Sequence, residues 1–169
     1  MRKLALTGAG VALLLGLAGV LSVAAVPGAA EPSTGKSTTL TFEVVFSPFS
    51  LVPANPVRNP NSPFALGDEL TFHDTLLSSG KQVGDELGSC VIVELSPPQA
   101  NCTDVIRLAG GNIAAQFANA PPPRKDLALT GGTGVYRNVG GEGSLVEFGN
   151  GTGALTLNVL SFPQKGGGA

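Results

Sequence analysis

The chain has 169 residues, of which 13% are charged and 5% aromatic, with no tryptophan and a formal net charge of −2. This size suits one domain with a real core. Mild acidity without a Lys/Arg cluster argues against nucleic acid and anionic membrane as partners. One histidine and two cysteines are too few for a zinc site of the usual ligand number. We therefore expect neither a metal nor a cofactor.

The first thirty residues have the pattern of a signal peptide. Arg2 and Lys3 precede an apolar run over residues 11–26, and small residues follow up to Ala30. We predict Sec-type export with cleavage near Ala30, cleavage after Ala25 and an uncleaved anchor being the alternatives. The mature chain would carry eight basic and twelve acidic residues, a net charge of −4. It has no second long apolar run, so we expect a secreted protein without an integral membrane anchor.

Beyond the leader, helical periodicity is absent and apolar residues alternate with polar ones between Gly and Pro clusters. This pattern predicts a single all-β domain over residues 31–165, either a closed barrel or a sandwich, followed by a flexible tail at 166–169. Gly84 and Gly88 are expected to form bulges within a long strand. The expected strands are 38–46, 68–77, 81–95, 102–108, 112–118, 126–130, 143–148 and 154–160.

A glycine-rich stretch over residues 128–143 joins two of the expected strands. Glycine reaches positive φ without steric cost, so this stretch is typical of a chain reversal between paired strands. A phosphate-binding loop is not supported, because the lysine-containing P-loop pattern and a following helix are both missing.

Residues 47–63 contain five prolines, which a helix interior or a central strand does not tolerate. We expect a long loop without regular structure. Its apolar residues, among them Phe49 and Leu51, favour a lid across one mouth of the barrel. The alternative is a loop packed on the outside of the barrel or on a neighbouring subunit.

Cys90 and Cys102 flank residues 96–98 symmetrically. A hairpin turn centred near Ser96 would place the two cysteines opposite each other, close enough for a disulfide. Export makes this bond chemically favourable. Two free, buried thiols are the alternative.

Asp74 is the most informative single side chain. It shares a strand face with Leu70, Phe72 and Leu76, and a carboxylate on an apolar face is costly unless it is hydrogen-bonded or lines a wet cavity. It is either a polar group in a ligand pocket or a structural carboxylate that accepts backbone N–H groups at the barrel mouth. His73 should point outward.

The positions of three further polar side chains can be predicted from the sequence. Glu94 and Asp104 share a face with the two cysteines, and we expect both to be solvated charges near strand ends, a second polar patch being the alternative. Tyr136, the only tyrosine, lies in the glycine-rich reversal, where it could close one end of the barrel.

Four segments in order resemble the allene oxide cyclase barrel-like family, whose barrel the dirigent proteins share. The resemblance covers about residues 66–160 and implies an eight-stranded antiparallel β-barrel with a largely apolar cavity. It also implies a homodimer or homotrimer. The segments are GDELTFHDTLL (67–77), GKQVG (80–84), GSCVIV (88–93) and ALTGGTG (128–134).

Members of that family cyclise lipid epoxides, steer radical coupling or close polyketide rings, largely by holding an apolar substrate in one conformation. The resemblance places Asp74 at a pocket asparagine of the cyclases, Cys90 at a pocket cysteine, and makes Glu43 the candidate for a first-strand glutamate. We predict Asp74 and Glu43 as catalytic residues of a cofactor-free isomerase or cyclase, and Phe72, Asp74, Cys90 and Tyr136 as ligand-binding residues. The alternatives are a non-catalytic carrier of apolar molecules and a structural envelope protein.

Overall fold

The computed structural model describes residues 35–55, 62–121 and 123–161. The expected signal peptide, the middle of the proline-rich segment and the expected C-terminal tail lie outside these residues. Within them, the secondary structure is nine strands and one 3₁₀ turn, η1 (Gly134–Tyr136). No helix in these ranges is long and apolar enough to cross a membrane. The strands are β1 (Lys36–Val45), β2 (Ser50–Val52), β3 (Glu69–Ser78), β4 (Lys81–Leu95), β5 (Pro98–Leu108), β6 (Gly111–Asn119), β7 (Arg124–Gly132), β8 (Val139–Glu147) and β9 (Thr152–Ser161).

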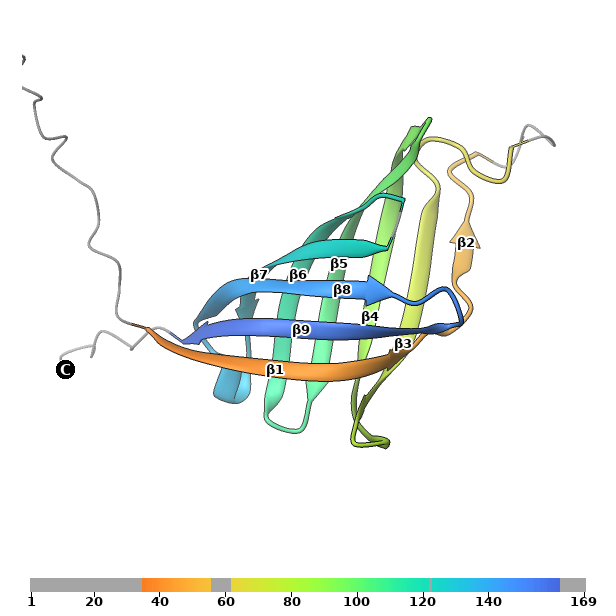
Figure 1. The fold of residues 1–169 in the computed structure, drawn as a ribbon. Helices are drawn as coiled ribbons and strands as arrows, with labels where there is room; N and C mark the ends of the chain where they lie inside the picture. Colours follow the sequence, from red (N-terminus) through yellow and green to blue (C-terminus); the bar gives the residue numbers. More distant parts are fainter. Residues whose placement is uncertain (1–34, 56–61, 122, 162–169) are drawn as a thin grey trace, which may run out of the picture. The chain divides into compact units, whose positions relative to one another are not determined.

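Eight of these strands form a closed antiparallel β-barrel, as the sequence predicts. The strand order is β1-β9-β8-β7-β6-β5-β4-β3, and a further pairing between β1 and β3 closes the ring. β2 adds three residues to the free part of the β3 edge. In Figure 1, β1, β9 and β8 cross in front of β3 to β6.

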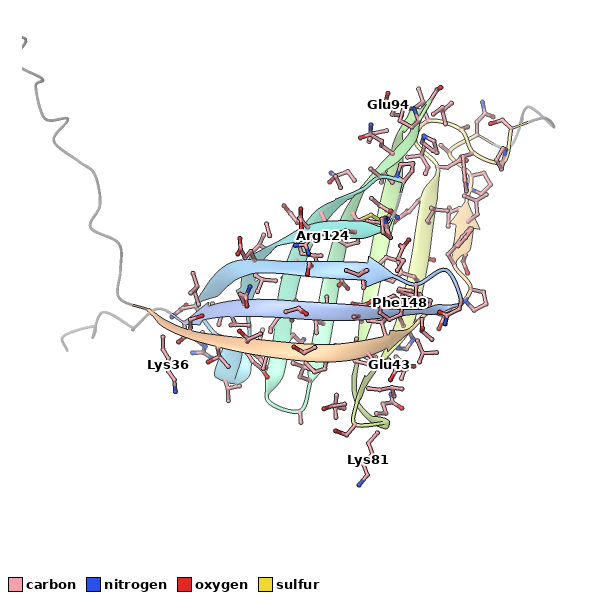
Figure 2. The ribbon with its side chains drawn as sticks, in the orientation of Figure 1. Lys36, Glu43, Lys81, Glu94, Arg124 and Phe148 are labelled. Atoms are coloured by element: carbon pink, nitrogen blue, oxygen red, sulfur yellow. A yellow bond between two sulfur atoms is a disulfide. The ribbon has the colours of Figure 1, made fainter. Side chains whose placement is uncertain are left out.

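Alternation along the strands fills the barrel with apolar side chains. On β1, Phe42 and Val44 are buried whereas Glu43 between them is exposed, and Figure 2 shows Glu43 on that strand. On β9, Leu155 and Leu157 are fully buried. This period of two turns one face of every strand inward. The main core consists of Phe42, Val44, Leu76, Ile106, Ile113, Ala115, Leu127, Leu129, Val139, Leu145, Leu155, Leu157 and Val159.

Each of the eight expected strands is present, and most are longer than expected by a few residues. Phe46, Asp68 and Phe148, expected at strand ends, lie one residue outside the observed strands. β2 is a correction, because Ser50–Val52 forms a short strand where the prolines predicted no regular structure. Ser50–Val52 lies between Pro48 and Pro53, so none of its own residues lacks a backbone N–H.

Gly88 is a second correction. The register shift between β3 and β4 falls next to Gly84, whereas Gly88 pairs regularly with Phe72. A Cβ on Gly88 would lie 2.2 Å from the Phe72 ring and 2.7 Å from the Thr103 carbonyl oxygen. Gly88 therefore leaves space for an aromatic ring inside the barrel rather than forming a bulge.

The disulfide between Cys90 and Cys102 is confirmed. The two residues are direct partners in the β4–β5 ladder, and both are buried on the inner face of the barrel. They form a second, smaller core with Ile92 and Ala100, packed by Phe64, Leu70, Phe72 and Phe117.

Removing this bond should destabilise the barrel. The two cysteines are 12 residues apart, and in the chain-entropy model a loop of that size corresponds to about 2–3 kcal/mol. We expect Cys90→Ala/Cys102→Ala to lower the free energy of unfolding in urea by about that amount. Equal stability of the double variant and the oxidised wild type would contradict the prediction.

Candidate functional site

The mouth of the barrel is hollow. We call the mouth the end where β1 stops, where β4 turns into β5, and where β6 connects to β7. A cavity of about 190 Å³ lies among the strands there, and a second of about 420 Å³ lies further along the same end. The two cavities share the wall residues Phe49, Leu70, Asn119 and Glu147. The inner cavity is also lined by Phe46, Ser47, Phe72, Asp74, Cys90, Phe117 and Leu145, and the outer one by Phe64, Ile92, Pro98, Ala100, Ala120, Pro121 and Lys125.

Asp74 ties the start of the proline-rich segment to the barrel. Its side chain is buried, and its Oδ1 atom accepts a hydrogen bond from the Ser47 backbone N–H at 2.6 Å. The Ser47 hydroxyl donates to the His73 carbonyl oxygen at 2.6 Å. Asp74 therefore accepts a backbone N–H at the mouth, as one interpretation of the sequence expects, and it also lines the inner cavity. Its place in a ligand pocket stays a prediction.

Asp68 also ties the chain around the proline-rich segment to the barrel. It is fully buried, its Oδ1 atom accepts the Ala54 N–H at 3.0 Å, and its Oδ2 atom accepts the Ala65 N–H at 2.7 Å. One carboxylate thus holds Ala54 of the proline-rich segment and Ala65, two residues beyond its end. Phe49 in the segment and Phe64 next to its end have ring centroids 6.5 Å apart, and both line the outer cavity.

Three buried carboxyl groups face the interior from adjacent strands, and we call them the carboxyl cluster: Asp74 on β3, Glu86 on β4 and Asp104 on β5. Their residues are 5%, 2% and 4% exposed. Asp74 and Glu86 are direct partners across the β3–β4 ladder. In the described residues, no group of three or more His, Cys, Asp or Glu is arranged to hold a metal ion.

Burial makes this cluster retain protons. Desolvation, with the charges of Asp104 and Asp74 in second place, raises the pKa of Glu86 from 4.5 to about 9. Desolvation also raises the pKa of Asp104 to about 7, against a hydrogen bond from Glu86 that lowers it. Glu86 is therefore the protonated donor and Asp104 the acceptor of their shared hydrogen bond. The pKa of Asp74 is raised by desolvation, which outweighs the Ser47 N–H.

The cluster also holds an unmatched acceptor. Oδ1 of Asp104 is buried, and within the described residues it has no hydrogen-bond partner. Burying an oxygen without a hydrogen-bond partner destabilises the folded state. Such unsatisfied groups are rare in native proteins and often mark strained or catalytic sites.

The structure brings together three of the ligand-binding residues that the sequence predicts: Phe72, Asp74 and Cys90 line the inner cavity. It does not bring Glu43 there, because the register of β1 turns this side chain outward. Tyr136 lies at the opposite end of the barrel, packed against the main core beside Gly110 and Gly132. The predicted catalytic role of Asp74 stays a prediction.

Sequence reasoning missed Glu86 and placed Asp104 in solvent. The signal for Asp104 was present, since it shares the strand parity of Cys102 and Ile106, both of which are fully buried. Glu94 is exposed as expected, because an irregularity between Ile92 and Glu94 changes which residues of the strand point outward. Its side chain accepts a hydrogen bond from Gln99.

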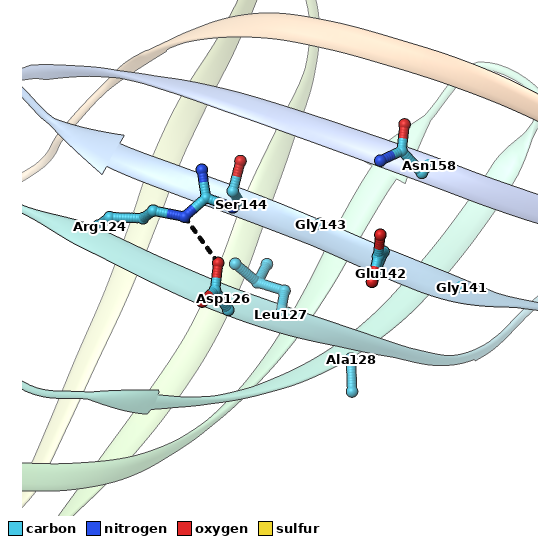
Figure 3. A pocket seen from close by; sticks show the side chains of 9 residues that line it. All are labelled: Arg124, Asp126, Leu127, Ala128, Gly141, Glu142, Gly143, Ser144 and Asn158. Atoms are coloured by element: carbon cyan, nitrogen blue, oxygen red, sulfur yellow. Dashed lines mark hydrogen bonds and ion pairs between the residues drawn. The ribbon is translucent and has the colours of Figure 1, made fainter.

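A larger hollow of about 670 Å³ lies on the outer face of β7, β8 and β9 (Figure 3). It contains an exposed ion pair between Arg124 and Asp126, with Nε and Oδ1 2.8 Å apart. Exposed pairs of this kind contribute little energy. The acids there point into solvent, so this hollow lacks the buried proton-holding groups of the mouth.

No protein-family model and no curated protein matches the sequence. Solved structures do. A pyocyanin demethylase superposes with a TM-score of 0.63 at 27% identity, over 72% of this chain and 99% of that one. A pterocarpan synthase dirigent protein superposes with a TM-score of 0.61 at 19% identity, over 85% of this chain and 99% of that one. The protein has the dirigent-like barrel fold.

A cyclase that catalyses a [4 + 2] cycloaddition in neoabyssomicin biosynthesis, described as binding heme nonspecifically, has the same fold. It superposes with a TM-score of 0.53 at 17% identity, over 80% of this chain and 72% of that one. Demethylation, pterocarpan synthesis and cycloaddition are thus named for proteins of one architecture. The dirigent-like fold therefore locates a cavity but does not select a reaction.

The raised pKa of Glu86 makes stability depend on pH with a definite sign. Between 4.5 and about 9 the folded protein keeps a proton that the unfolded chain releases, so stability falls as pH rises through this window. We expect the free energy of unfolding to decrease by an amount of the order of a few kcal/mol from pH 5 to pH 8. Urea unfolding at both pH values measures the change.

Glu86→Gln should flatten this dependence and raise stability at pH 8, because the amide can still donate to Asp104 without losing a proton. The matched control is Glu142→Gln, which changes an exposed carboxylate on the outer face of β8. If the two variants show the same pH slope as the wild type, Glu86 does not hold the proton.

Asp68→Ala should also destabilise the fold, because it leaves the Ala54 and Ala65 N–H groups without this acceptor. Hydrogen bonds to a charged group support an expected loss of about 2–4 kcal/mol in urea unfolding. Asp126→Ala, which removes an exposed carboxylate, is the control and should change stability by less than about 1 kcal/mol. Similar losses in both variants would contradict the role of Asp68 as the anchor of the segment.

Proposed function

We propose that this protein binds a small apolar molecule in the mouth of the barrel and guides its isomerisation, cyclisation or coupling. The observation that carries the proposal is the carboxyl cluster, of which Asp74 lines an aromatic-walled cavity while Glu86 and Asp104 are buried on the neighbouring strands. Phe72 and Asp74 meet at the inner cavity, and Glu86 is the partner of Asp74 in the ladder. Proton-holding acids next to an apolar pocket are a recurrent feature of acid–base sites.

The chemistry that suits this arrangement leaves the substrate's composition unchanged. Asp74, the member of the cluster that lines the cavity, donates a proton to an oxygen or nitrogen of the substrate and takes one back from another substrate atom. A bond within the substrate forms or moves, and no oxidant, reductant or cofactor is consumed. The pKa of Asp74 is raised, and Glu86 and Asp104 in the same cluster, with pKa values of about 9 and about 7, keep protons close to neutral pH.

The second part of the proposed mechanism is confinement. The aromatic side chains of Phe46, Phe49, Phe72 and Phe117 line the inner cavity, so they would hold an apolar substrate in one conformer and exclude water. The proline-rich segment contributes Phe49 to this wall, and we propose that it acts as a lid. Planar ring systems fit such walls, and pyocyanin, named for a protein of the same fold, is a suitable first probe.

A non-catalytic carrier is the second candidate function, favoured by the apolar outer cavity and its two phenylalanines. A structural envelope role requires a filled interior and is less consistent with hollow space at the mouth. We further propose that the protein is exported, for which the disulfide is a supporting feature. We also propose a homodimer or homotrimer. Native mass spectrometry of the exported protein measures bound ligand and oligomer together.

Ligand binding at the mouth can be tested with phenylnaphthylamine, an uncharged dye that fluoresces in apolar sites. Leu70 lines both cavities, so Leu70→Trp should fill the space and weaken dye binding by about tenfold. Thr71→Trp places the same ring on the outer face of the same strand and should leave binding unchanged. Equal binding by wild type and Leu70→Trp would refute the proposed cavity.

The catalytic part is tested with any molecule that co-purifies, whereas pyocyanin serves as a probe of binding. A ligand that binds wild type and Asp74→Asn equally and is never converted identifies a carrier. Conversion by wild type that is lost in Asp74→Asn while binding persists supports a role of the cluster in catalysis.

A further inference from the structure

Lys125 is an unusual residue for the interior of a barrel. It lies near the start of β7, where Arg124 and Asp126 on either side are exposed, and it is itself only 3% exposed. The strand alternation therefore turns an ammonium group inward. Lysine is almost never fully buried unless its charge is matched.

The partners of Lys125 match its charge incompletely. Its Nζ atom donates to the Ala120 carbonyl oxygen at 2.9 Å and lies 3.4 Å from Oε2 of Glu147. An ammonium group has three N–H donors, and among the described residues these two are the acceptors within reach. Glu147 is 37% exposed, so solvent shares its charge. Counted over the described residues alone, one donor of Lys125 is left for a group that enters the cavity.

Lys125 also stands at one end of a continuous apolar space. It lines the outer cavity together with Phe49, Phe64 and Leu70. Phe49 and Leu70 also line the inner cavity, at whose wall Asp74 lies. The mouth therefore has a cationic group at its outer part, an apolar middle, and an acidic group at its inner part.

We propose that Lys125 determines ligand specificity by binding a carboxylate, or another anionic oxygen group, of a molecule whose apolar body fills the mouth cavity. The inference rests on the proposed function, because it requires the mouth to bind an apolar molecule. It adds the chemical class of that molecule, an apolar acid, and the direction in which it enters, with the anionic end toward Lys125 and the apolar end toward Phe72.

Glu147 sets the strength of this interaction. It lines both cavities and competes with an incoming anion for Lys125. Removing its charge should free the ammonium group and reduce the negative potential at the mouth. A purely structural Lys125–Glu147 pair makes the opposite prediction, because its loss would loosen the site and weaken every ligand.

Two dyes with the same ring system separate these readings. Anilinonaphthalene sulfonate carries an anionic group, and phenylnaphthylamine lacks it. We expect Lys125→Met to weaken the sulfonate dye by about tenfold and to change the uncharged dye by less than about twofold, as loss of one charge-assisted hydrogen bond requires. Lys125→Arg should retain most of the affinity for the sulfonate dye. Displacement of the sulfonate dye by phenylnaphthylamine shows that both occupy the same site.

Glu147→Gln should bind the sulfonate dye several-fold more tightly and the uncharged dye as wild type does. Lys81→Met, which removes an exposed lysine at the other end of the barrel, is the matched control and should bind both dyes like wild type. Thermal unfolding and circular dichroism establish that each variant is folded. Equal weakening of both dyes by Lys125→Met, or unchanged binding of the sulfonate dye, overturns the inference. Failure of wild type to bind either dye overturns the proposed function itself.

Discussion

A short seam between β1 and β3 closes the barrel, and the mouth exists because that seam is short. Only Glu43, Val44 and Val45 pair with β3, at Thr75 to Leu77. Beyond Val45, β1 can no longer cover the β3 edge, and the chain turns outward at Ser47, held by Asp74. β2 then pairs with the remaining edge at Glu69 to Thr71. Without the pairing of β2, the barrel would present an unprotected strand edge. β3 therefore takes part both in closing the barrel, through β1, and in forming the mouth, through β2.

The carboxyl cluster works against the stability of this closed barrel. Three desolvated acids on neighbouring strands would be replaced at a gain by apolar side chains of similar size, if stability alone decided. The main core and the disulfide across the β4–β5 ladder offset this cost. Residues that lower the stability of the fold beside a cavity, while the rest of the barrel offsets the loss, are expected at a functional site.

Period-two patterns and one symmetric turn made much of the fold predictable. The strands, the Cys90–Cys102 bond and the inward direction of Asp74 all follow from local alternation. Glu86 was not predictable, because Gly84 and Gly88 interrupt the apolar alternation around it. The outward direction of Glu43 depended on a one-residue choice of register, which pairing with distant β9 decides. β2 and the anchoring by Asp68 are likewise products of non-local contacts.

The polarity of the mouth offers a physical reason why one barrel can serve several reactions. The apolar walls set only the shape of the ligand, whereas the groups at the two ends set its orientation. In this chain Asp74 lines the inner cavity and the ammonium group of Lys125 lines the outer one. An apolar acid bound between them would have one direction of entry, and its reactive part would face the proton-holding carboxyl groups rather than water. Orientation of this kind lowers the entropic barrier to ring closure without any covalent step by the protein. A neutral ligand would lack that constraint and could bind in either direction, as a carrier requires.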